Sequence, residues 1–278
     1  GAGASAGTLN VEAAFAGCVK VNDELLLTSH EIGGWDKESV VKVTSVADAS
    51  NGNLVVSGSM PSDMPTEANL IAAEKAFAVE VARLNRDVVL TAEQEDATVN
   101  VGAGDDVVQH GGHFIVMHTP NVAQKISGLE IRGFGQQGEL GRYPIHFHMG
   151  ADVAGSVVSK NVIRQSNQRC INIHGTNNVW IEDNVAYDTS GHCMVLEDGA
   201  ETGNTFKRNL AARTRKHTAK ELKAQTGSSA SNVNTKESST VSSFWVTNAA
   251  NHYENNVAAG SASIGYWFDT QKQVNGMS

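Results

Sequence analysis

The segment "WIEDNVAYDTS" (residues 180–190) carries the pattern that decides the fold of this chain. Its Asn184 is followed by an apolar residue, Val185, and preceded, three positions earlier, by the apolar Ile181. Three further segments repeat this pattern: "VVSKNVIRQS" (157–166), "FKRNLAART" (206–214) and "YENNVAAGS" (253–261). The asparagines of the four segments are 23, 25 and 47 positions apart. Because the last interval contains a polar run, we expect one repeat to carry a long insertion.

A period of about 20–25 residues, built from short strands without helical periodicity, is typical of a parallel β-helix. A leucine-rich repeat is the competing solenoid, but its regular leucine template is absent. Successive coils of a β-helix stack at the strand spacing of about 4.8 Å, so equivalent residues form ladders. We therefore predict a ladder of hydrogen-bonded side-chain amides at one turn. Its members are Asn161, Asn184, Asn209 and Asn256.

A second set of strands aligns at the same period, with alternate residues facing the core. The aligned segments are "FIVMH" (114–118), "PIHFH" (144–148), "CINIH" (170–174), "CMVLE" (193–197), "SFWVT" (243–247) and "GYWFD" (265–269). The predicted inward pairs are Ile115/Met117, Ile145/Phe147, Ile171/Ile173, Met194/Leu196, Phe244/Val246 and Tyr266/Phe268. The outward column at the strand ends reads His118, His148, His174, Glu197, Thr247 and Asp269. The outward column two residues earlier reads Val116, His146, Asn172, Val195, Trp245 and Trp267.

Composition excludes several classes of protein. With 278 residues, 18% charged and 40% hydrophobic, the chain has the composition of a globular protein rather than a disordered one. The net charge of −9 argues against nucleic acid as a partner. No apolar run approaches the roughly 20 residues that span a bilayer, so we expect no membrane span. The absence of a signal-peptide pattern and of a terminal cap suggests an excerpt of a longer parent chain, whose remaining parts would be partners.

The outward ladder places imidazoles beside a carboxylate. Neighbouring coils bring His148, His174 and Glu197 close enough to ligate one divalent metal ion of undefined identity. His146 is a candidate fourth ligand or a supporting group. The same ladder could instead perform acid–base chemistry on a sugar chain, with Glu197 paired to Asp198 or Glu201. An exposed polar stack that only hydrates the surface remains the third alternative.

The candidate site residues fall into two groups. The candidate catalytic residues are Glu197, Asp198 and His148. The candidate substrate-binding residues are His146, Asn172, Trp245 and Trp267. The two tryptophans stack in this register and could form an exposed platform for sugar rings, or the insertion could cover them.

Two of the three cysteines also fall in one outward column. Cys170 and Cys193 lie on neighbouring coils, at a Cα separation that a disulfide accepts. We predict a disulfide if the protein is extracellular and two free thiols if it is cytosolic. Cys18 is left unpaired.

Long stretches of the chain resemble a known family. The stretches are "VKVNDELLLTSH" (19–30), "FAVEVARLNRDVVL" (77–90), "GRYPIHFHMG" (141–150) and "CINIHGTNNVWIEDNVAYDTSGHCMVLEDGAETGNTF" (170–206). They resemble the ectodomains of the cell-migration-inducing hyaluronidase, its transmembrane relative and fibrocystin-type receptors. The resemblance implies an all-β chain: a partial G8-like β domain over residues 1–108 and a right-handed parallel β-helix over 109–278. The polar insertion near 215–242 departs from the pattern of the family. His192 is also one of the motif residues that match the family. In our register its side chain points inward, so we expect a structural role for it.

The resemblance implies an extracellular or cell-surface setting. We therefore predict an extracellular module that binds a polysaccharide or matrix glycan. It could also depolymerise a hyaluronan-like glycan at the His/Glu ladder; as an enzyme it would be a polysaccharide hydrolase or depolymerase. The alternative is a non-catalytic structural or adhesive ectodomain, in which the β-helix is a rigid rod.

Overall fold

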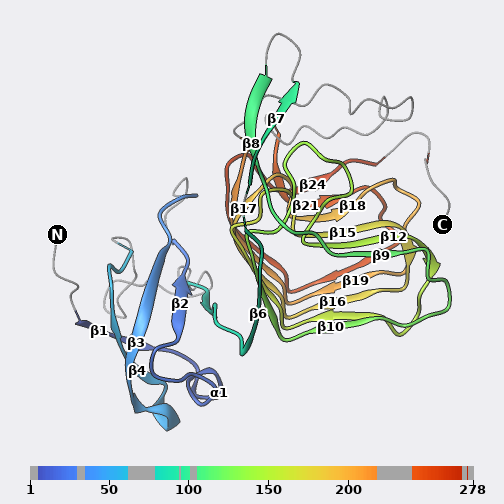
Figure 1. The fold of residues 1–278 in the computed structure, drawn as a ribbon. Helices are drawn as coiled ribbons and strands as arrows, with labels where there is room; N and C mark the ends of the chain where they lie inside the picture. The colour runs from blue at the N-terminus through green and yellow to red at the C-terminus, as the bar shows by residue number, and fades with distance from the viewer. Residues whose placement is uncertain are drawn as a thin grey trace. The chain divides into compact units, whose positions relative to one another are not determined.

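The structure is a computed structural model that describes residues 6–29, 35–61, 79–93, 95–100, 105–217, 240–270 and 274 (Figure 1). The chain divides into two compact units, residues 1–85 and 86–278. Most of the polar insertion predicted near 215–242 lies outside the described residues. Within the described residues the regular elements are almost all strands, which confirms the predicted all-β class.

The first unit contains a five-stranded antiparallel sheet in the order β1-β4-β3-β2-β5. Its elements are β1 (Ala6–Asn10), α1 (Ala13–Ala16), β2 (Glu24–Leu27), β3 (Ser39–Asp48), the 3-10 helix η1 (Ala49–Asn51), β4 (Asn53–Ser57) and β5 (Val81–Arg83). Alternate residues of these strands, such as Val41 and Val43 or Leu54 and Val56, are buried in one core. That alternation is what a sheet with one buried face requires.

The second unit begins with β6 (Val88–Thr91) and the antiparallel pair β7 (Glu95–Asn100) and β8 (Asp105–His110). Three parallel sheets follow, which we call sheets I, II and III. Sheet I contains β9 (Ile115–Met117), β12 (Ile145–Asp152), β15 (Ile171–Asn177), β18 (Met194–Leu196), β21 (Ser242–Val246) and β24 (Ile264–Phe268). Sheet II contains β10 (Lys125–Ser127), β13 (Val157–Ser159), β16 (Trp180–Glu182), β19 (Thr205–Lys207) and β22 (His252–Glu254). Sheet III contains β6, β11 (Leu129–Arg132), β14 (Val162–Arg164), β17 (Val185–Ser190), β20 (Leu210–Arg215) and β23 (Val257–Ser261).

From β9 onward the chain visits sheets I, II and III in turn, and each circuit pairs in parallel with the one before it. Figure 1 shows the strands of each sheet stacked along one direction. One circuit is called a coil below. This winding is a parallel β-helix, as predicted.

The predicted asparagine ladder is confirmed at the turn between sheets II and III. Oδ1 of Asn184 accepts hydrogen bonds from the backbone N–H and the side-chain amide of Asn161, at 3.1 and 3.0 Å. Asn209 does the same for Asn184, and Asn256 does the same for Asn209. The ladder therefore provides hydrogen-bond partners for buried polar groups that have none in the sheets at this turn.

The predicted register of sheet I is confirmed from β12 onward. His146 pairs with Asn172 and His148 with His174, and the alignment continues through β18, β21 and β24. The predicted inward residues of these strands fill the main core up to β21: Ile145, Phe147, Ile171, Ile173, Met194, Leu196, Phe244 and Val246. The last predicted inward residue, Phe268, belongs to the edge strand β24 and is 68% exposed.

The predicted register of the first strand of sheet I is wrong by one residue. Met117, rather than His118, lies beside His148. Val116 therefore enters the core, Met117 is exposed, and His118 lies beyond the strand, outside the ladder. Four successive apolar residues, 114–117, gave the alternation no polar marker, and a slip of one residue exchanges the two faces.

Candidate functional site

The candidate site lies on the outer side of sheet I. His146 and His148 project from β12, His174 projects from β15, and Glu197 and Asp198 follow the end of β18 directly. Because Ile173 pairs with Leu196, the next residue places Glu197 beside His174. The sheet register thus gathers groups from three coils into one row.

His174 is the centre of this row. Its Nδ1 lies 3.0 Å from Nδ1 of His148 and 3.6 Å from Oε2 of Glu197. Its Nε2 lies 2.6 Å from Oδ2 of Asp198. The His174 side chain keeps 21% of its surface exposed, whereas the two acidic side chains are buried. The imidazole of His174 is therefore partly exposed to solvent, while the carboxylates that contact it are buried.

Glu197 is fixed from the opposite side by two residues. Nη1 of Arg169 lies 3.1 Å from Oε1 of Glu197, and Nδ2 of Asn172 donates a hydrogen bond of 2.8 Å to Oε2. The same Arg169 nitrogen donates to Oδ1 of Asn172 at 2.6 Å. Arg169 is completely buried, and its guanidinium packs 4.5 Å from the ring centre of Tyr143. Glu197 is thus held rigidly with both carboxylate oxygens engaged.

The neighbours of these groups shift their pKa values in opposite directions. Burial alone raises the pKa of Glu197, but Arg169, His174 and the Asn172 hydrogen bond lower it to about 2. Burial alone lowers the pKa of His174, but the hydrogen bond to Asp198 and the charge of Glu197 raise it. Burial and the neighbouring His174 lower the pKa of His148. At neutral pH the row therefore combines an ionised Glu197 with a neutral His148.

His146 occupies the buried end of the row. It is 1% exposed, and its Nδ1 lies 2.9 Å from the carbonyl oxygen of Gly141. Burial, outweighing the charge of Glu197, lowers the pKa of His146 to about 3. Its ring lies parallel to that of His174, with 6.0 Å between the ring centres. His146 is therefore a neutral imidazole that faces the other two histidines.

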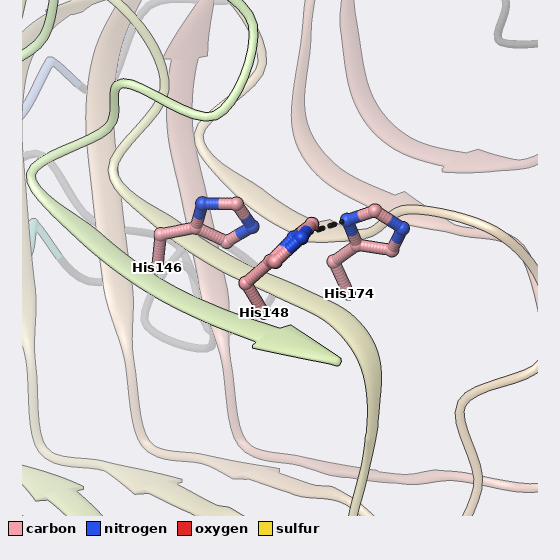
Figure 2. A group of neighbouring side chains, drawn as sticks. All are labelled: His146, His148 and His174. Atoms are coloured by element: carbon pink, nitrogen blue, oxygen red, sulfur yellow. Dashed lines mark hydrogen bonds between the residues drawn. The ribbon is translucent and has the colours of Figure 1, made fainter. Parts of the chain in front are cut away.

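The three histidines are close enough to hold one metal ion. One ring nitrogen from each of His146, His148 and His174 lies within 4.8 Å of the other two (Figure 2). The sequence had grouped His148 and His174 with Glu197 and had left His146 as a fourth or supporting group. In the structure Glu197 is already engaged by Arg169 and Asn172.

The tryptophans stack as predicted, with 5.4 Å between the ring centres of Trp245 and Trp267. Trp245 is nevertheless fully buried, so it is not the exposed sugar platform that the sequence suggested. Trp267 and His192 pack on its ring, and its Nε1 donates to Asp269 at 3.3 Å. Trp267 remains partly exposed. His192 is buried beside these rings, where its Nδ1 accepts a hydrogen bond from the backbone N–H of Ser242.

Three further residues take roles that alternation did not predict. Asn172, proposed as a substrate contact, is fully buried and orients Glu197. Glu201, considered as a partner carboxylate, is fully buried and accepts backbone hydrogen bonds from Gly175, Asp198 and Gly199. Arg169 was missed, because it precedes the strand and belongs to neither outward column. The only signal in the sequence that could have identified Arg169 is that a basic residue stands directly before Cys170 at the start of a strand.

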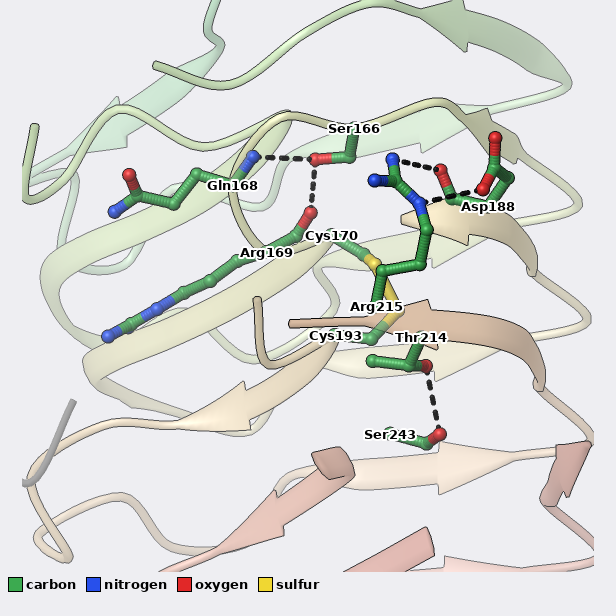
Figure 3. Close-up of a disulfide and its surroundings, with 9 residues drawn as sticks. All are labelled: Ser166, Gln168, Arg169, Cys170, Asp188, Cys193, Thr214, Arg215 and Ser243. Carbon is green, nitrogen blue, oxygen red and sulfur yellow. Dashed lines mark hydrogen bonds and ion pairs between the residues drawn. A yellow bond between two sulfur atoms is a disulfide. The ribbon is translucent and has the colours of Figure 1, made fainter. Parts of the chain in front are cut away.

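A disulfide fastens the coils beside Arg169. Cys170 and Cys193 are bonded, with 4.6 Å between their Cα atoms (Figure 3). Both are fully buried in the main core rather than facing outward. The hydroxyl of Ser166 donates to the carbonyl oxygen of Arg169 in the same turn. Disulfide and turn together fix the backbone that presents the Arg169 side chain to Glu197.

Several known proteins are similar in sequence to most of this chain. The human protein named cell surface hyaluronidase CEMIP2 is 34% identical over 218 residues, which is 72% of this chain and 16% of the human protein. Protein rliB of Dictyostelium discoideum is 36% identical over 67% of this chain and 16% of its own length. The mouse cell migration-inducing and hyaluronan-binding protein is 34% identical over 68% of this chain and 15% of its own length. The chain thus spans about a sixth of the length of these relatives.

Within the described residues, no helix has the length and apolar character needed to cross a membrane.

The sequence model of the family described as CEMIP beta-helix matches residues 109–278. This match covers the coils that carry the histidine row, the asparagine ladder and the disulfide. The chain therefore belongs to the CEMIP β-helix family.

Proposed function

We propose that this β-helix binds an acidic polysaccharide of the hyaluronan type outside the cell, on the outer side of sheet I. The observation that carries the proposal is the row of partly exposed imidazoles, His148 and His174, above the buried carboxylates of Glu197 and Asp198. A row of polar groups along successive coils suits an extended polymer better than a small metabolite. The names of relatives, cell surface hyaluronidase and hyaluronan-binding protein, support this glycan class and an extracellular setting.

His174 is the group we assign to recognition of the glycan carboxylate. The acidic residues around it raise its pKa, which favours the cationic imidazolium. Because the side chain is partly exposed, this charge can reach a bound polyanion. Among the candidate aromatic contacts, Trp267 is the one with exposed surface for a sugar ring.

Depolymerisation is the finer part of the proposal. Glycoside hydrolysis requires a group that moves a proton and a negative charge that stabilises the positive charge developing on the sugar ring. His148, neutral at neutral pH, is the candidate base. Glu197, ionised and fixed by Arg169, is the candidate electrostatic stabiliser, and Asp198 orients His174.

The test is size-exclusion chromatography of hyaluronan of defined length, incubated with the protein at neutral pH, with and without a chelator. A neutral polysaccharide is run in parallel. The His174→Ala and His148→Ala variants are compared with His252→Ala, which removes an exposed histidine on sheet II. Co-elution that is weakened by His174→Ala but not by His252→Ala supports binding, and shortened chains that are lost in His148→Ala support depolymerisation. If hyaluronan neither co-elutes with the protein nor becomes shorter, both parts of the proposal are overturned. The rigid structural or adhesive ectodomain is then the remaining function.

A further inference from the structure

Three imidazoles converge from two adjacent strands of sheet I. His146 and His148 alternate on β12, and His174 lies directly beside His148 on β15. The centres of their rings are 4.7 to 6.0 Å apart. Figure 2 shows the His148 ring between the other two, with its nitrogen directed at His174. A hydrated surface does not require such a convergence.

Among the residues that the structure describes, one buried nitrogen of His146 has no hydrogen-bond partner. A carbonyl oxygen only accepts, so the contact with Gly141 places the hydrogen of a neutral ring on Nδ1. Nε2 of His146 then carries a lone pair, and none of the described residues donates a hydrogen bond to this buried atom. An unsatisfied buried acceptor is costly, and binding a metal ion would satisfy it.

His174 is oriented in the same manner. Its Nε2 donates to Oδ2 of Asp198, and its Nδ1 is directed toward His148 at 3.0 Å. A metal ion bound at this Nδ1 would displace the proton that the imidazolium form carries there. Metal-binding histidines typically donate their other ring N–H to a carbonyl or a carboxylate, which fixes the tautomer and aims the lone pair at the ion. Gly141 and Asp198 supply these two acceptors.

We propose that His146, His148 and His174 form a binding site for a divalent transition-metal ion of the Zn²⁺ type. The ligand atoms are Nε2 of His146, Nδ1 of His174 and a ring nitrogen of His148. Glu197, held by Arg169 and Asn172, supplies negative charge beside the ion but is not a ligand. Three nitrogen donors favour Zn²⁺ over Ca²⁺ and Mg²⁺, which prefer oxygen.

The spacing fits an ion of this size. Two nitrogens that bind Zn²⁺ tetrahedrally at about 2.0–2.1 Å are about 3.3 Å apart. The nitrogens of His148 and His174 are already 3.0 Å apart. The other separations, within 4.8 Å, must shorten by at most about 1.5 Å, which small rotations of the rings can supply. Three histidines leave a fourth position for water or a ligand oxygen.

The experiment is isothermal titration of the chelator-treated protein with Zn²⁺ and, separately, with Ca²⁺. We expect one Zn²⁺ per chain, no comparable Ca²⁺ binding, and a higher melting temperature with Zn²⁺. Co²⁺ provides a second readout, because its visible absorption strengthens when the hydrated ion enters a four-coordinate site.

Four variants test the ligand set. His146→Ala and His148→Ala should each weaken Zn²⁺ binding by at least about 100-fold. His148 is half-buried, so its variant remains informative if His146→Ala fails to fold. Glu197→Gln should retain binding within about tenfold, and the control His252→Ala should not change it. Unchanged Zn²⁺ affinity in the His148→Ala variant, or a larger loss in Glu197→Gln than in His148→Ala, would overturn the assignment.

The inference does not rest on glycan binding. The titration contains no polysaccharide, so failure of the metal site and failure of the hyaluronan proposal give different results. A bound ion would occupy a nitrogen of His148, so metal-loaded and metal-free protein should differ in the hyaluronan assay.

Discussion

The guanidinium of Arg169 lies 3.1 Å from Oε1 of Glu197, and both side chains are buried. The two residues come from neighbouring coils, Arg169 from the turn before β15 and Glu197 from the end of β18. This pair ties the solvent-facing histidine row to the interior of the β-helix. Its strength and its dependence on pH can both be measured.

Removing one member of this pair should destabilise the protein strongly. Arg169→Ala leaves the Glu197 carboxylate buried without its cation, which typically costs about 3–5 kcal/mol. The control is Arg208→Ala, which removes a guanidinium from the exposed pair with Asp183 and should cost less than about 1 kcal/mol. The free energy of unfolding in urea is the measurement. Equal losses in the two variants would show that burial does not govern the Arg169–Glu197 pair.

Glu197 should make the β-helix sensitive to acid. Its pKa is lowered to about 2 from the ordinary value of 4.5, so it stabilises the fold above pH 4.5. This contribution is lost as the pH falls from 4.5 toward 2, with a slope of up to about 1.4 kcal/mol per pH unit. Urea unfolding of wild type and Glu197→Gln at several pH values isolates the effect, because other acidic groups are common to both. Parallel pH curves for the two proteins would contradict the assignment.

The asparagine ladder should be most sensitive in its middle. Asn184→Ala removes the acceptor of two Asn161 hydrogen bonds and leaves the Val158 carbonyl without its side-chain donor. We expect a loss of at least about 2 kcal/mol in the free energy of unfolding, because buried partners are left unsatisfied. Asn256→Ala, at the half-buried end of the ladder, should cost less. A reversed order in chemical denaturation would indicate that the ladder is not the cause.

The disulfide should stabilise the fold chiefly through the unfolded state. The bond between Cys170 and Cys193 closes a loop with a sequence separation of 23 residues. Loop-closure entropy for this length corresponds to about 3 kcal/mol. The double variant Cys170→Ala/Cys193→Ala should therefore melt at a lower temperature, measured by circular dichroism. Cys18→Ala, at an exposed free cysteine, should melt as the wild type does; a double variant that did the same would refute the prediction.

The spacing of Asn161, Asn184, Asn209 and Asn256 was sufficient to predict a β-helix and the ladder itself. Alternation in "PIHFH", "CINIH" and "CMVLE" predicted the sheet register that stacks His148, His174 and Glu197. Both inferences succeed because stacked coils repeat the same local environment, so each pattern recurs at one period. The pattern fails at Phe114–Met117, where every residue is apolar, so either register would turn apolar side chains toward the core.

The sequence by itself determined the coil period, the asparagine ladder and the order of residues along the histidine row. Only the tertiary structure decided that Arg169 holds Glu197, that Trp245 is buried, and that His146 turns a nitrogen without a partner toward His148 and His174. These features depend on contacts made by the turns, such as the Gly141 carbonyl and the Arg169 guanidinium. Turn residues do not follow the period of the strands, so only packing in three dimensions reveals which side chains they meet.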